Sequence, residues 1–367
     1  LTGTGGDVNL DGLGYSYSNE YGSGSGIYNS RDGSIETGDS NDTLTGSGGD
    51  VNLNLTIYNS VHYTQYGNGS GIHNNGTIET GEGNDTVTGI GGDVNFNLTI
   101  YDSVHRTQYS NGSGIHNNGT IETGEGNDTL TGIGGDVNFI LKNINGYGGE
   151  EVEYINSSGI YNSGSIDTGE GSDAITGTGG DVTLNIDSID GYEYVNGSGI
   201  YNDGNIKTGQ GADTLTGIGG DVQLNGYKDY SYGIYNSANG SIETGDNGDV
   251  LTGSGNKAGI YNDGTITTGK GNDRIIADGG FEGFGTIDLG ADSDYIKGFG
   301  SGTFLGGYGT DTLELTAGDY LVGISQSTVN FTSGEITMQT NSFEQLIAGS
   351  TTYDFSNLFN GQSITVV

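Results

Sequence analysis

The 367-residue sequence contains no cysteine, no proline and no tryptophan. Without cysteine the chain can form neither disulfides nor thiolate-bound zinc sites, and cysteine-based catalysis is excluded. Without proline it fits neither a collagen-type triple helix nor a polyproline linker. No run of about 18 apolar residues is present, so we expect no insertion into a membrane.

Basic residues are also scarce. Nine Lys and Arg stand against 47 Asp and Glu, which gives a formal net charge of −38 at pH 7. A chain this acidic repels nucleic acid and anionic membrane surfaces, so neither is an expected partner. Cations are the natural partners of such a surface.

Glycine is abundant where large apolar residues are few. The chain has 76 glycines and only 31% hydrophobic residues. Each glycine costs about 1 kcal/mol in a helix, so a helical bundle is excluded. The regular patterning described next also excludes a disordered chain.

One phrase is repeated along the chain, and this internal repeat is the strongest signal in the sequence. Residues 54–96 match residues 97–139 with only four changes, at a period of 43 residues. A looser phrase consists of GIYN, a turn, SIET, TGxGxD, a short apolar step and TGxGGDV. Its first glycine recurs at Gly26, Gly71, Gly114, Gly159, Gly199, Gly233 and Gly259. The spacing falls from 45 to 26 residues, so the repeat shortens toward the C-terminus.

Within each phrase apolar and polar residues alternate, as a β-strand requires. In GIYN, Ile27 and Asn29 face one side of the strand and Tyr28 faces the other. Glycine, Asn, Asp and Ser separate the strands and tolerate the left-handed backbone of tight turns. Short strands and glycine turns, repeated every 20–50 residues or so, are typical of a solenoid. The sequence therefore predicts an all-β fold, a parallel β-solenoid of stacked coils.

Stacking would place equivalent residues above one another. Inside the solenoid we predict an amide ladder that satisfies turn carbonyls. Its members are Asn29, Asn74, Asn117, Asn162, Asn202, Asn236 and Asn262. One position earlier we predict an outward aromatic stack of Tyr28, His73, His116, Tyr161, Tyr201, Tyr235 and Tyr261.

The stretch after GGDV varies between repeats. In residues 54–70 it holds two alternating runs around Asn59 and Ser60. We interpret these stretches as hairpin arms that extend one side of the coil; the alternative is a second, irregular coil. Shrinking arms would make the body taper toward a C-terminal cap. The expected domains are a long-coil solenoid with arms at 1–278, a short-coil solenoid at 279–320 and a β cap at 321–367.

The phrase TGEGNDTLT at 123–131 combines a glycine turn, an aspartate and a large apolar residue. Here the sequence resembles the RTX family of calcium-binding repeat proteins, whose nonapeptide is GGxGxDxUx with U a large apolar residue. In that family the turn directs backbone carbonyls and the aspartate toward Ca²⁺ between stacked coils. The resemblance implies an RTX-like β-roll or β-helix in which the matching carboxylates bind Ca²⁺. These are Asp42, Asp85, Asp128, Asp173, Asp213, Asp249, Asp273, Asp294 and Asp311.

Elementary chemistry supports Ca²⁺ as the cofactor. Ca²⁺ takes 6–8 oxygen ligands, including carboxylates and backbone carbonyls, and glycine lets the backbone approach a common centre. Stacked aspartates without a cation would repel one another. Because the unfolded chain offers no preformed cage, metal binding would be coupled to folding.

The sequence also departs from the family pattern. The first glycine of the nonapeptide is usually Thr, and most loops lie a whole long repeat apart. A second set of aspartates, in GGDV, forms weaker metal candidates: Asp7, Asp50, Asp93, Asp136, Asp181 and Asp221. The alternative for both sets is a Gly/Asp turn without metal, since Asp caps turns by itself.

These features predict a secreted calcium-binding structural repeat protein, extracellular or at the cell surface, and not an enzyme. Extracellular calcium would fill weak sites that the cytosol leaves empty. Resemblance to RTX proteins implies one-step export with an uncleaved C-terminal signal. Leu1 begins inside the phrase, so we expect an open β edge that pairs with another copy. Head-to-tail stacking would give a filament or surface layer; a truncated or processed chain is the rival explanation.

Two other functions stay open. The 24 tyrosines crowd the arms, for example at Tyr15, Tyr58 and Tyr66, and either pair within the arms or form an interface. An adhesin that binds glycans or matrix would use them as contacts. A β-helix polysaccharide lyase or epimerase would need paired acids, but catalysis needs a singular constellation and these acids recur in every coil.

Overall fold

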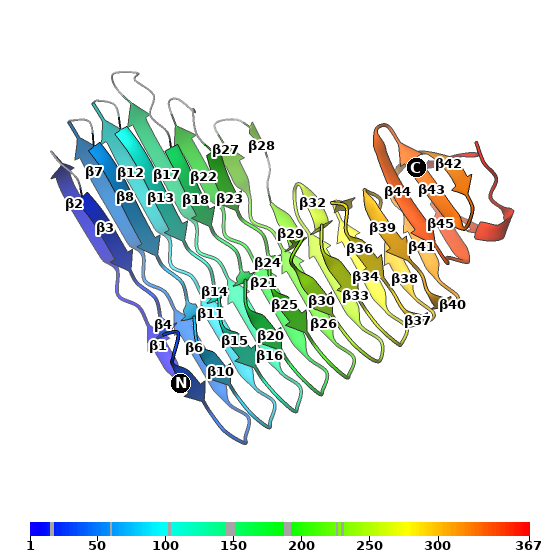
Figure 1. Ribbon diagram of the computed structural model, residues 1–367, viewed down its shortest axis with the longest axis horizontal. Helices are drawn as coiled ribbons and strands as arrows, with labels where there is room; N and C mark the ends of the chain where they lie inside the picture. Colours follow the sequence, from blue (N-terminus) through cyan, green and yellow to red (C-terminus); the bar gives the residue numbers. More distant parts are fainter. Residues whose placement is uncertain are drawn as a thin grey trace.

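The computed structural model describes residues 1–14, 18–58, 61–101, 104–143, 151–186, 192–224, 227–228 and 231–367. The chain winds into coils that stack along one long axis, and the coils are long at the N-terminal end and short at the C-terminal end (Figure 1). Every coil pairs with the next through parallel strands in register. The predicted parallel β-solenoid and its taper are confirmed.

Three sheets form the body of the solenoid. The first body sheet contains, in spatial order, β1 (Thr2–Thr4), β6 (Thr43–Ser47), β11 (Thr86–Ile90), β16 (Thr129–Ile133), β21 (Ala174–Thr178), β26 (Thr214–Ile218), β31 (Val250–Ser254), β34 (Arg274–Asp278), β38 (Tyr295–Lys297), β41 (Thr312–Leu315), β45 (Gln345–Ala348) and β46 (Thr351–Asp354). The corner sheet contains β4 (Ile27–Asn29), β9 (Ile72–Asn74), β14 (Ile115–Asn117), β19 (Ile160–Asn162), β24 (Ile200–Asn202), β29 (Tyr232–Asn236), β32 (Ala258–Asn262) and β35 (Phe281–Glu282).

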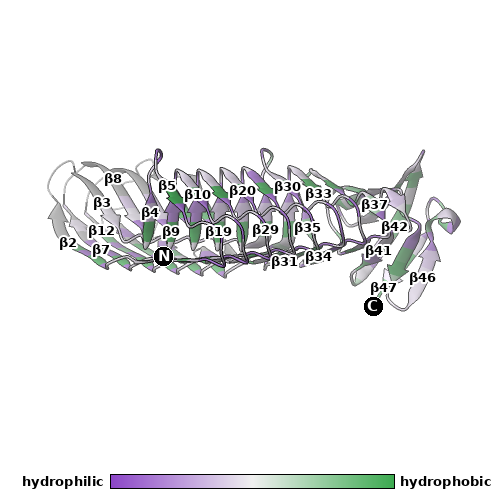
Figure 2. Ribbon diagram, turned by 90° about the horizontal axis from the view of Figure 1, so that it is seen from below, coloured by the Kyte–Doolittle hydropathy of each residue, from purple (hydrophilic) through white to green (hydrophobic). Residues whose placement is uncertain are grey.

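The second body sheet runs along the opposite side of the body (Figure 2). Its strands are β5 (Ser34–Glu36), β10 (Thr77–Glu79), β15 (Thr120–Glu122), β20 (Ser165–Asp167), β25 (Asn205–Lys207), β30 (Ser241–Glu243), β33 (Thr265–Thr267), β36 (Thr286–Asp288), β39 (Gly302–Leu305), β44 (Ile336–Asn341), β43 (Thr328–Ser333), β42 (Gly318–Ser325) and β47 (Ser363–Val366). One buried apolar residue from most of the short strands, such as Ile115, Ile121 and Leu130, fills the core between the sheets.

The variable stretches form arms that extend one side of the long coils, as expected. The first arm sheet contains β2 (Val8–Gly14), β7 (Val51–Ile57), β12 (Val94–Ile100), β17 (Val137–Asn143), β22 (Val182–Ile186), β27 (Val222–Leu224) and β28 (Tyr227–Lys228). The second contains β3 (Ser18–Ser23), β8 (Val61–Asn68), β13 (Val104–Asn111), β18 (Glu151–Asn156) and β23 (Tyr192–Asn196). Val94, Phe96 and Phe139 belong to a separate core between them.

The pairing inside the arms differs from that of ordinary hairpins. The two strands of an arm join different sheets and pair in parallel with the neighbouring arms. In the part of the chain that the structure describes, β27 and β28 are the one arm pair with antiparallel bonds. The predicted arm centre at Asn59 and Ser60 lies outside the described residues.

Antiparallel strands close the C-terminal end. β42, β43, β44 and β47 pair antiparallel, as do β45 and β46. The short 3-10 helix η1 (Phe355–Asn357) follows, and two small strands, β37 (Ala291–Asp292) and β40 (Tyr308–Gly309), pair nearby. Phe331, Met338 and Phe355 are buried and extend the body core under these strands. The predicted terminal cap therefore covers the last coil.

The predicted asparagine ladder stands inside the body. Each of its amides donates to the Oδ1 of the next one at 2.8–2.9 Å, from Asn29 to Asn262. Asn117 also donates to the carbonyls of Ser165 and Gly119, at 3.0 and 3.2 Å. The ladder thus satisfies turn carbonyls that water cannot reach.

Glycines form a waist between the body core and the arm core. The second glycine of GGDV donates its N–H across the two layers, for example from Gly92 to Gly69 O and from Gly135 to Gly112 O, both at 2.7 Å. A Cβ at Gly91 would collide with the carbonyl oxygen of Gly112. The GGDV phrase therefore has a structural reason, because only glycine lets the two layers touch backbone to backbone.

We predict that replacing Asn117 with Ala lowers the free energy of unfolding by about 3 kcal/mol, because it leaves several buried polar partners unsatisfied. Denaturant unfolding followed by circular dichroism measures the change. The matched control is Asn118→Ala, since Asn118 is exposed and its side chain makes only exposed bonds, donating to Asn75 Oδ1 at 2.9 Å and accepting from Ser163 Oγ at 2.7 Å. Equal losses in the two variants would contradict a stabilising ladder.

The close backbone contact at the waist leads to a second prediction about stability. Gly91→Ala should destabilise the protein by at least about 1–3 kcal/mol, because a Cβ has no room between the layers. Gly6→Ala is the control, since a Cβ there meets nothing within 4 Å. Thermal melting of both variants checks the difference, and a Gly91→Ala protein as stable as the control would refute the close contact.

Candidate metal centre

The nine aspartates predicted to bind metal form a single column. They lie where each loop from the second body sheet enters the first body sheet (Figure 1). The backbone N–H of each aspartate donates to the Oδ1 of the aspartate one coil further on, at 2.7–2.9 Å, from Asp42 through Asp294. The column ends at the cap, where the Asp311 N–H donates to Glu344 Oε2 at 2.8 Å. Asp85 and the aspartates that follow it are buried.

Two glycines shape most of the loops, while the first loop has Ser40 in place of the second glycine. In the loop before Asp128, Gly124 and Gly126 have φ angles of 96° and 137°, in the region that favours glycine. In two later loops the second glycine is replaced, by Asn247 at φ 88° and by Asp292 at φ 87°. The same turn is therefore kept through the change of residue, and it delivers the aspartate to the same place in each coil.

The threonine that departs from the RTX pattern has its own role. The hydroxyl of Thr123 donates to the carbonyl oxygen of Thr168 at 3.2 Å, and Thr80 donates in the same way to Thr123. Equivalent bonds link the other threonines at this position along the body. The threonine column is buried over most of its length and fixes the base of the loop without a left-handed backbone.

The second carboxylate oxygen of every aspartate in the column is left without a partner. From Asp85 to Asp311 the Oδ1 accepts the neighbour's N–H, whereas Oδ2 is buried and has no hydrogen-bond partner in all nine. Unpaired buried carboxylate oxygens are costly, so nine at equivalent positions favour the binding of a cation or a proton there. This is the observation that separates the column from an ordinary turn motif.

Burial also perturbs the acidity of the column. It raises the pKa of Asp249 and Asp294 to about 7, and that of Asp173 and Asp273 to about 6. The N–H bond to the carboxylate partly opposes the rise, as does the nearby hydroxyl of the loop threonine, for example Thr244 beside Asp249. The pKa values of Asp128, Asp213 and Asp311 are raised for the same reason. Near neutral pH the column therefore gains much from anything that stabilises the carboxylate charge.

The donor set fits a hard cation in type and spacing. Neighbouring strands lie about 4.8 Å apart, which is about twice the Ca²⁺–oxygen distance of about 2.4 Å, so an ion between two coils could reach an oxygen from each. Within the described ranges no three acidic or histidine side chains converge on one point. A bound ion would therefore share carboxylates of adjacent coils and draw its other ligands from backbone or hydroxyl oxygens.

The GGDV aspartates form a different ladder. They are exposed, and each Oδ1 accepts the N–H of the next aspartate at 2.8–3.1 Å, from Asp7 to Asp221. Their side chains therefore cap the backbone of the neighbouring coil beside the glycine waist. This geometry accounts for the aspartates as turn residues, and none of them has a buried oxygen without a partner.

The predicted aromatic stack is present. His73, His116 and Tyr161 follow one another with ring centroids 4.7 and 4.6 Å apart, and the column continues to Tyr261. Burial lowers the pKa of His116 to about 3, so its ring stacks as a neutral group. A second column in the arms includes Tyr66 and Tyr109, 4.9 Å apart.

These aromatic rings lie face to face with one another. Their faces are thus covered by the rings of neighbouring coils. Tyrosine rings of neighbouring arms therefore stack on one another, as Tyr58 and Tyr101 do with ring centroids 4.9 Å apart. Tyr15 lies outside the described residues.

Several ladders were missed by sequence reasoning. The threonine column is one; another is an exposed amide ladder in which Asn52, Asn95 and Asn138 each donate to the asparagine of the preceding coil at 3.0–3.1 Å. A third caps the aspartate loops, where Asn41 Oδ1 accepts the Asn84 N–H at 2.9 Å. The signal was available, since all of these residues recur in phase with the repeat.

Comparison with family models, curated proteins and solved structures finds no match for this chain. In the part of the chain that the structure describes, no helix is both long and apolar enough to cross a bilayer. The conclusion about this molecule thus stands on its own geometry: a parallel β-solenoid with a buried aspartate column and stacked asparagine ladders.

The raised pKa values of the column aspartates predict how the free energy of unfolding depends on pH. A carboxyl whose pKa is higher in the folded state adds stability below its ordinary pKa of about 3.9, and this stability is lost as pH rises through the folded value. For the column, that loss falls mainly between about pH 4 and the values of 6 to 7. The melting temperature of metal-stripped protein should therefore fall as pH rises from 5 to 8.

The double variant Asp249→Asn and Asp294→Asn keeps both Oδ1 acceptors and should show a flatter pH profile in the same metal-free buffers. Because the whole protein is acidic, some loss of stability with rising pH will persist in the variant. An unchanged slope in the variant would show that the column does not carry the dependence.

Proposed function

We propose that this protein is a secreted structural repeat protein whose aspartate column binds Ca²⁺ between successive coils, in the manner of RTX repeats. The observation that carries the proposal is the set of nine buried Oδ2 atoms without partners. The residues that would hold the ions are the nine column aspartates, from Asp42 to Asp311. When bound, Ca²⁺ supplies the positive charge that a buried row of carboxylates lacks.

Calcium is favoured over the other ways of satisfying the column. Lys or Arg could neutralise a carboxylate, but in the described part of the chain the ion pairs of lysine join Glu243, Glu282, Asp246 and Glu314, which lie outside the column. Protonation would neutralise Asp249 and Asp294 only in part at neutral pH, because burial raises their pKa to about 7. A divalent ion with oxygen ligands works at neutral pH, and extracellular fluid supplies Ca²⁺ at the concentrations that weak sites need.

The structural role follows from the shape. Repeated coils give a rod in which the aspartates recur at equivalent positions from coil to coil. Calcium between coils would stiffen this rod. As a part of the same proposal, copies assemble into a filament or surface layer outside the cell. The strands β1 to β5 lie at the edges of their sheets, while the cap covers the last coil, so contacts at the two ends would differ.

Calorimetric titration of the metal-stripped full chain with CaCl₂ tests calcium binding. We expect binding heat and a higher melting temperature, since Ca²⁺ at 100 times its Kd adds about 2.7 kcal/mol per site. Asp128→Asn keeps the Oδ1 that accepts the Asp85 N–H and removes only the unpaired oxygen. It should lower the number of bound ions and the calcium-induced rise in melting temperature.

The matched control is Asp136→Asn, eight residues further on in the exposed ladder. It also keeps its Oδ1 acceptor, here for the Asp181 N–H, and should bind as much Ca²⁺ as the unmodified protein. If the unmodified protein gives neither heat nor a thermal shift, or if both variants lose calcium equally, the column is not the site. Negative-stain microscopy with Ca²⁺ tests assembly, and dispersed single rods would count against it.

A further inference from the structure

The outer face of the first body sheet carries no charge over seven successive strands, β1, β6, β11, β16, β21, β26 and β31. Its outward side chains are Thr, Ser, Ile, Ala or Val, because the other residues of each strand point into the core or are glycine. In a chain with a net charge of −38, this is an unusual surface. Charges return only in the next strand, at Arg274 and Asp278.

Threonines form two parallel columns on this face. In β6, β11, β16 and β26 the strand starts as Thr, a buried apolar residue, Thr. The parallel register aligns the second threonine of these strands with Thr176 and Thr252 in one unbroken column, whereas Ala174 and Val250 interrupt the column of the first threonine. A third column holds Ile90, Ile133 and Ile218, which are 39%, 40% and 44% exposed, with Ser or Thr in the other coils. The face is therefore a two-dimensional array of hydroxyl and methyl groups.

The spacing of the array is fixed by the backbone. Columns repeat every two residues, about 6.7 Å along a strand, and rows repeat about every 4.8 Å between strands. Figure 2 shows the strands of this sheet stacked in a nearly straight row along one side of the body. A partner that uses the whole face must be periodic in two directions at such spacings.

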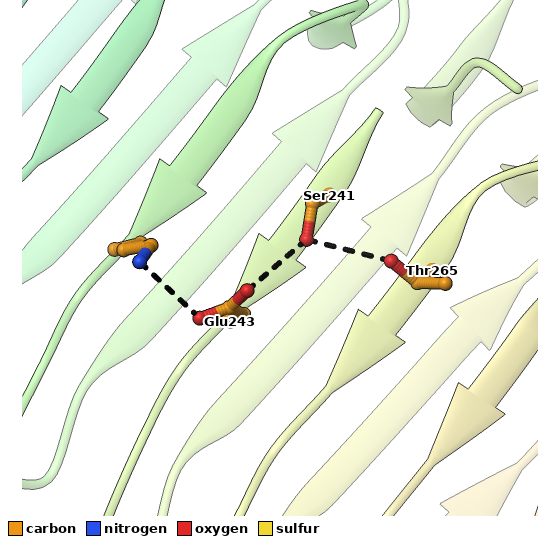
Figure 3. A network of polar contacts seen from close by, with 4 residues as sticks. Ser241, Glu243 and Thr265 are labelled. Carbon is orange, nitrogen blue, oxygen red and sulfur yellow. Dashed lines mark hydrogen bonds and ion pairs between the residues drawn. The ribbon is translucent and has the colours of Figure 1, made fainter. Parts of the chain in front are cut away.

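The opposite side of the same coils is different. The second body sheet carries Glu79, Glu122 and Asp167 in register on its outer face, followed by Lys207 and Glu243, which lie 3.6 Å apart. Figure 3 shows Glu243 with Ser241 and Thr265 on neighbouring strands of that sheet. Because both faces belong to the same repeat, the lack of charge on the first body sheet does not follow from stacking.

We propose that this uncharged threonine face of the first body sheet binds ice. Each threonine offers a hydroxyl that both donates and accepts a hydrogen bond and a methyl group beside it. Without charged groups to organise their own hydration shells, water at such a face is arranged by the array itself. Ice is the partner that presents water at regular spacings in two directions.

Other occupants fit less well. A second copy of this chain would need a more apolar interface, since the core of a stable dimer is rich in aromatic and large apolar residues. These seven strands have no aromatic residue, so they offer no ring face to a sugar. An acidic or basic macromolecule has no countercharge to meet on these strands.

Thermal hysteresis, the gap between melting and freezing points of a single ice crystal, tests the proposal in the calcium-loaded full chain. We expect a measurable gap and faceted crystals. Thr131→Tyr, in the centre of the face, should reduce the gap several-fold because the ring stands above the array. Thr120→Tyr is the matched control, since Thr120 faces outward from β15 of the same coil on the second body sheet.

Circular dichroism and calcium titration of each variant show that the fold and the metal column are kept. Should Thr131→Tyr misfold, Thr88→Lys in β11 with its control Thr77→Lys in β10 replaces the pair. The proposal fails if the unmodified protein shows neither hysteresis nor inhibition of ice recrystallisation, or if face and control variants lose activity equally. It also fails if sedimentation velocity shows that the face holds two copies together and the dimer shows no ice activity.

Discussion

Parallel backbone pairing between coils in register is the constraint on which this molecule depends. Each strand bonds to the equivalent strand of the next coil, so each residue type meets its own kind about 4.8 Å away along the axis. Asparagine, threonine and aromatic side chains gain from such repetition, because amides bond to amides and rings stack on rings. Stacked carboxylates are destabilised by the same repetition, because it brings equal negative charges close together.

The acidic columns are relieved in different ways. Outer columns such as that of Glu79 and Glu122 are exposed to water. In another outer column, further along the body, Lys270 pairs with Asp246 at 2.8 Å. The buried aspartate column has neither remedy. Backbone N–H groups bond to one carboxylate oxygen, as from Asp128 to Asp173 Oδ1, and the second oxygen of each column aspartate has no hydrogen-bond partner. The proposed calcium ions would bind these unpaired, buried carboxylate oxygens, which the exposed GGDV ladder does not have.

The same repeat produces two unlike faces because strands alternate their side chains and the coil has two sides. One side carries charged columns and the other an uncharged threonine array, while both share the core that Ile121 and Leu130 help to fill. Glycines at the waist bring the layers together and separate the body core from the arm core. A rod stabilised from inside is thereby free to use its outer faces for contact with its surroundings.

The sequence alone determined the architecture, since repeats in phase require equivalent positions to stack. It therefore gave the solenoid, the Asn117 ladder, the aromatic column, the taper and the cap, and it brought the nine aspartates into one column. It ranked the Asp136 ladder below the Asp128 column as a metal candidate, but it left a metal-free glycine–aspartate turn open for both. Only the tertiary structure decided that one carboxylate is buried with a free oxygen and the other exposed, because burial depends on which layer each loop meets. Nor did the sequence show that arm strands pair between coils, because local alternation is the same whether a strand bonds to its hairpin partner or to the next coil.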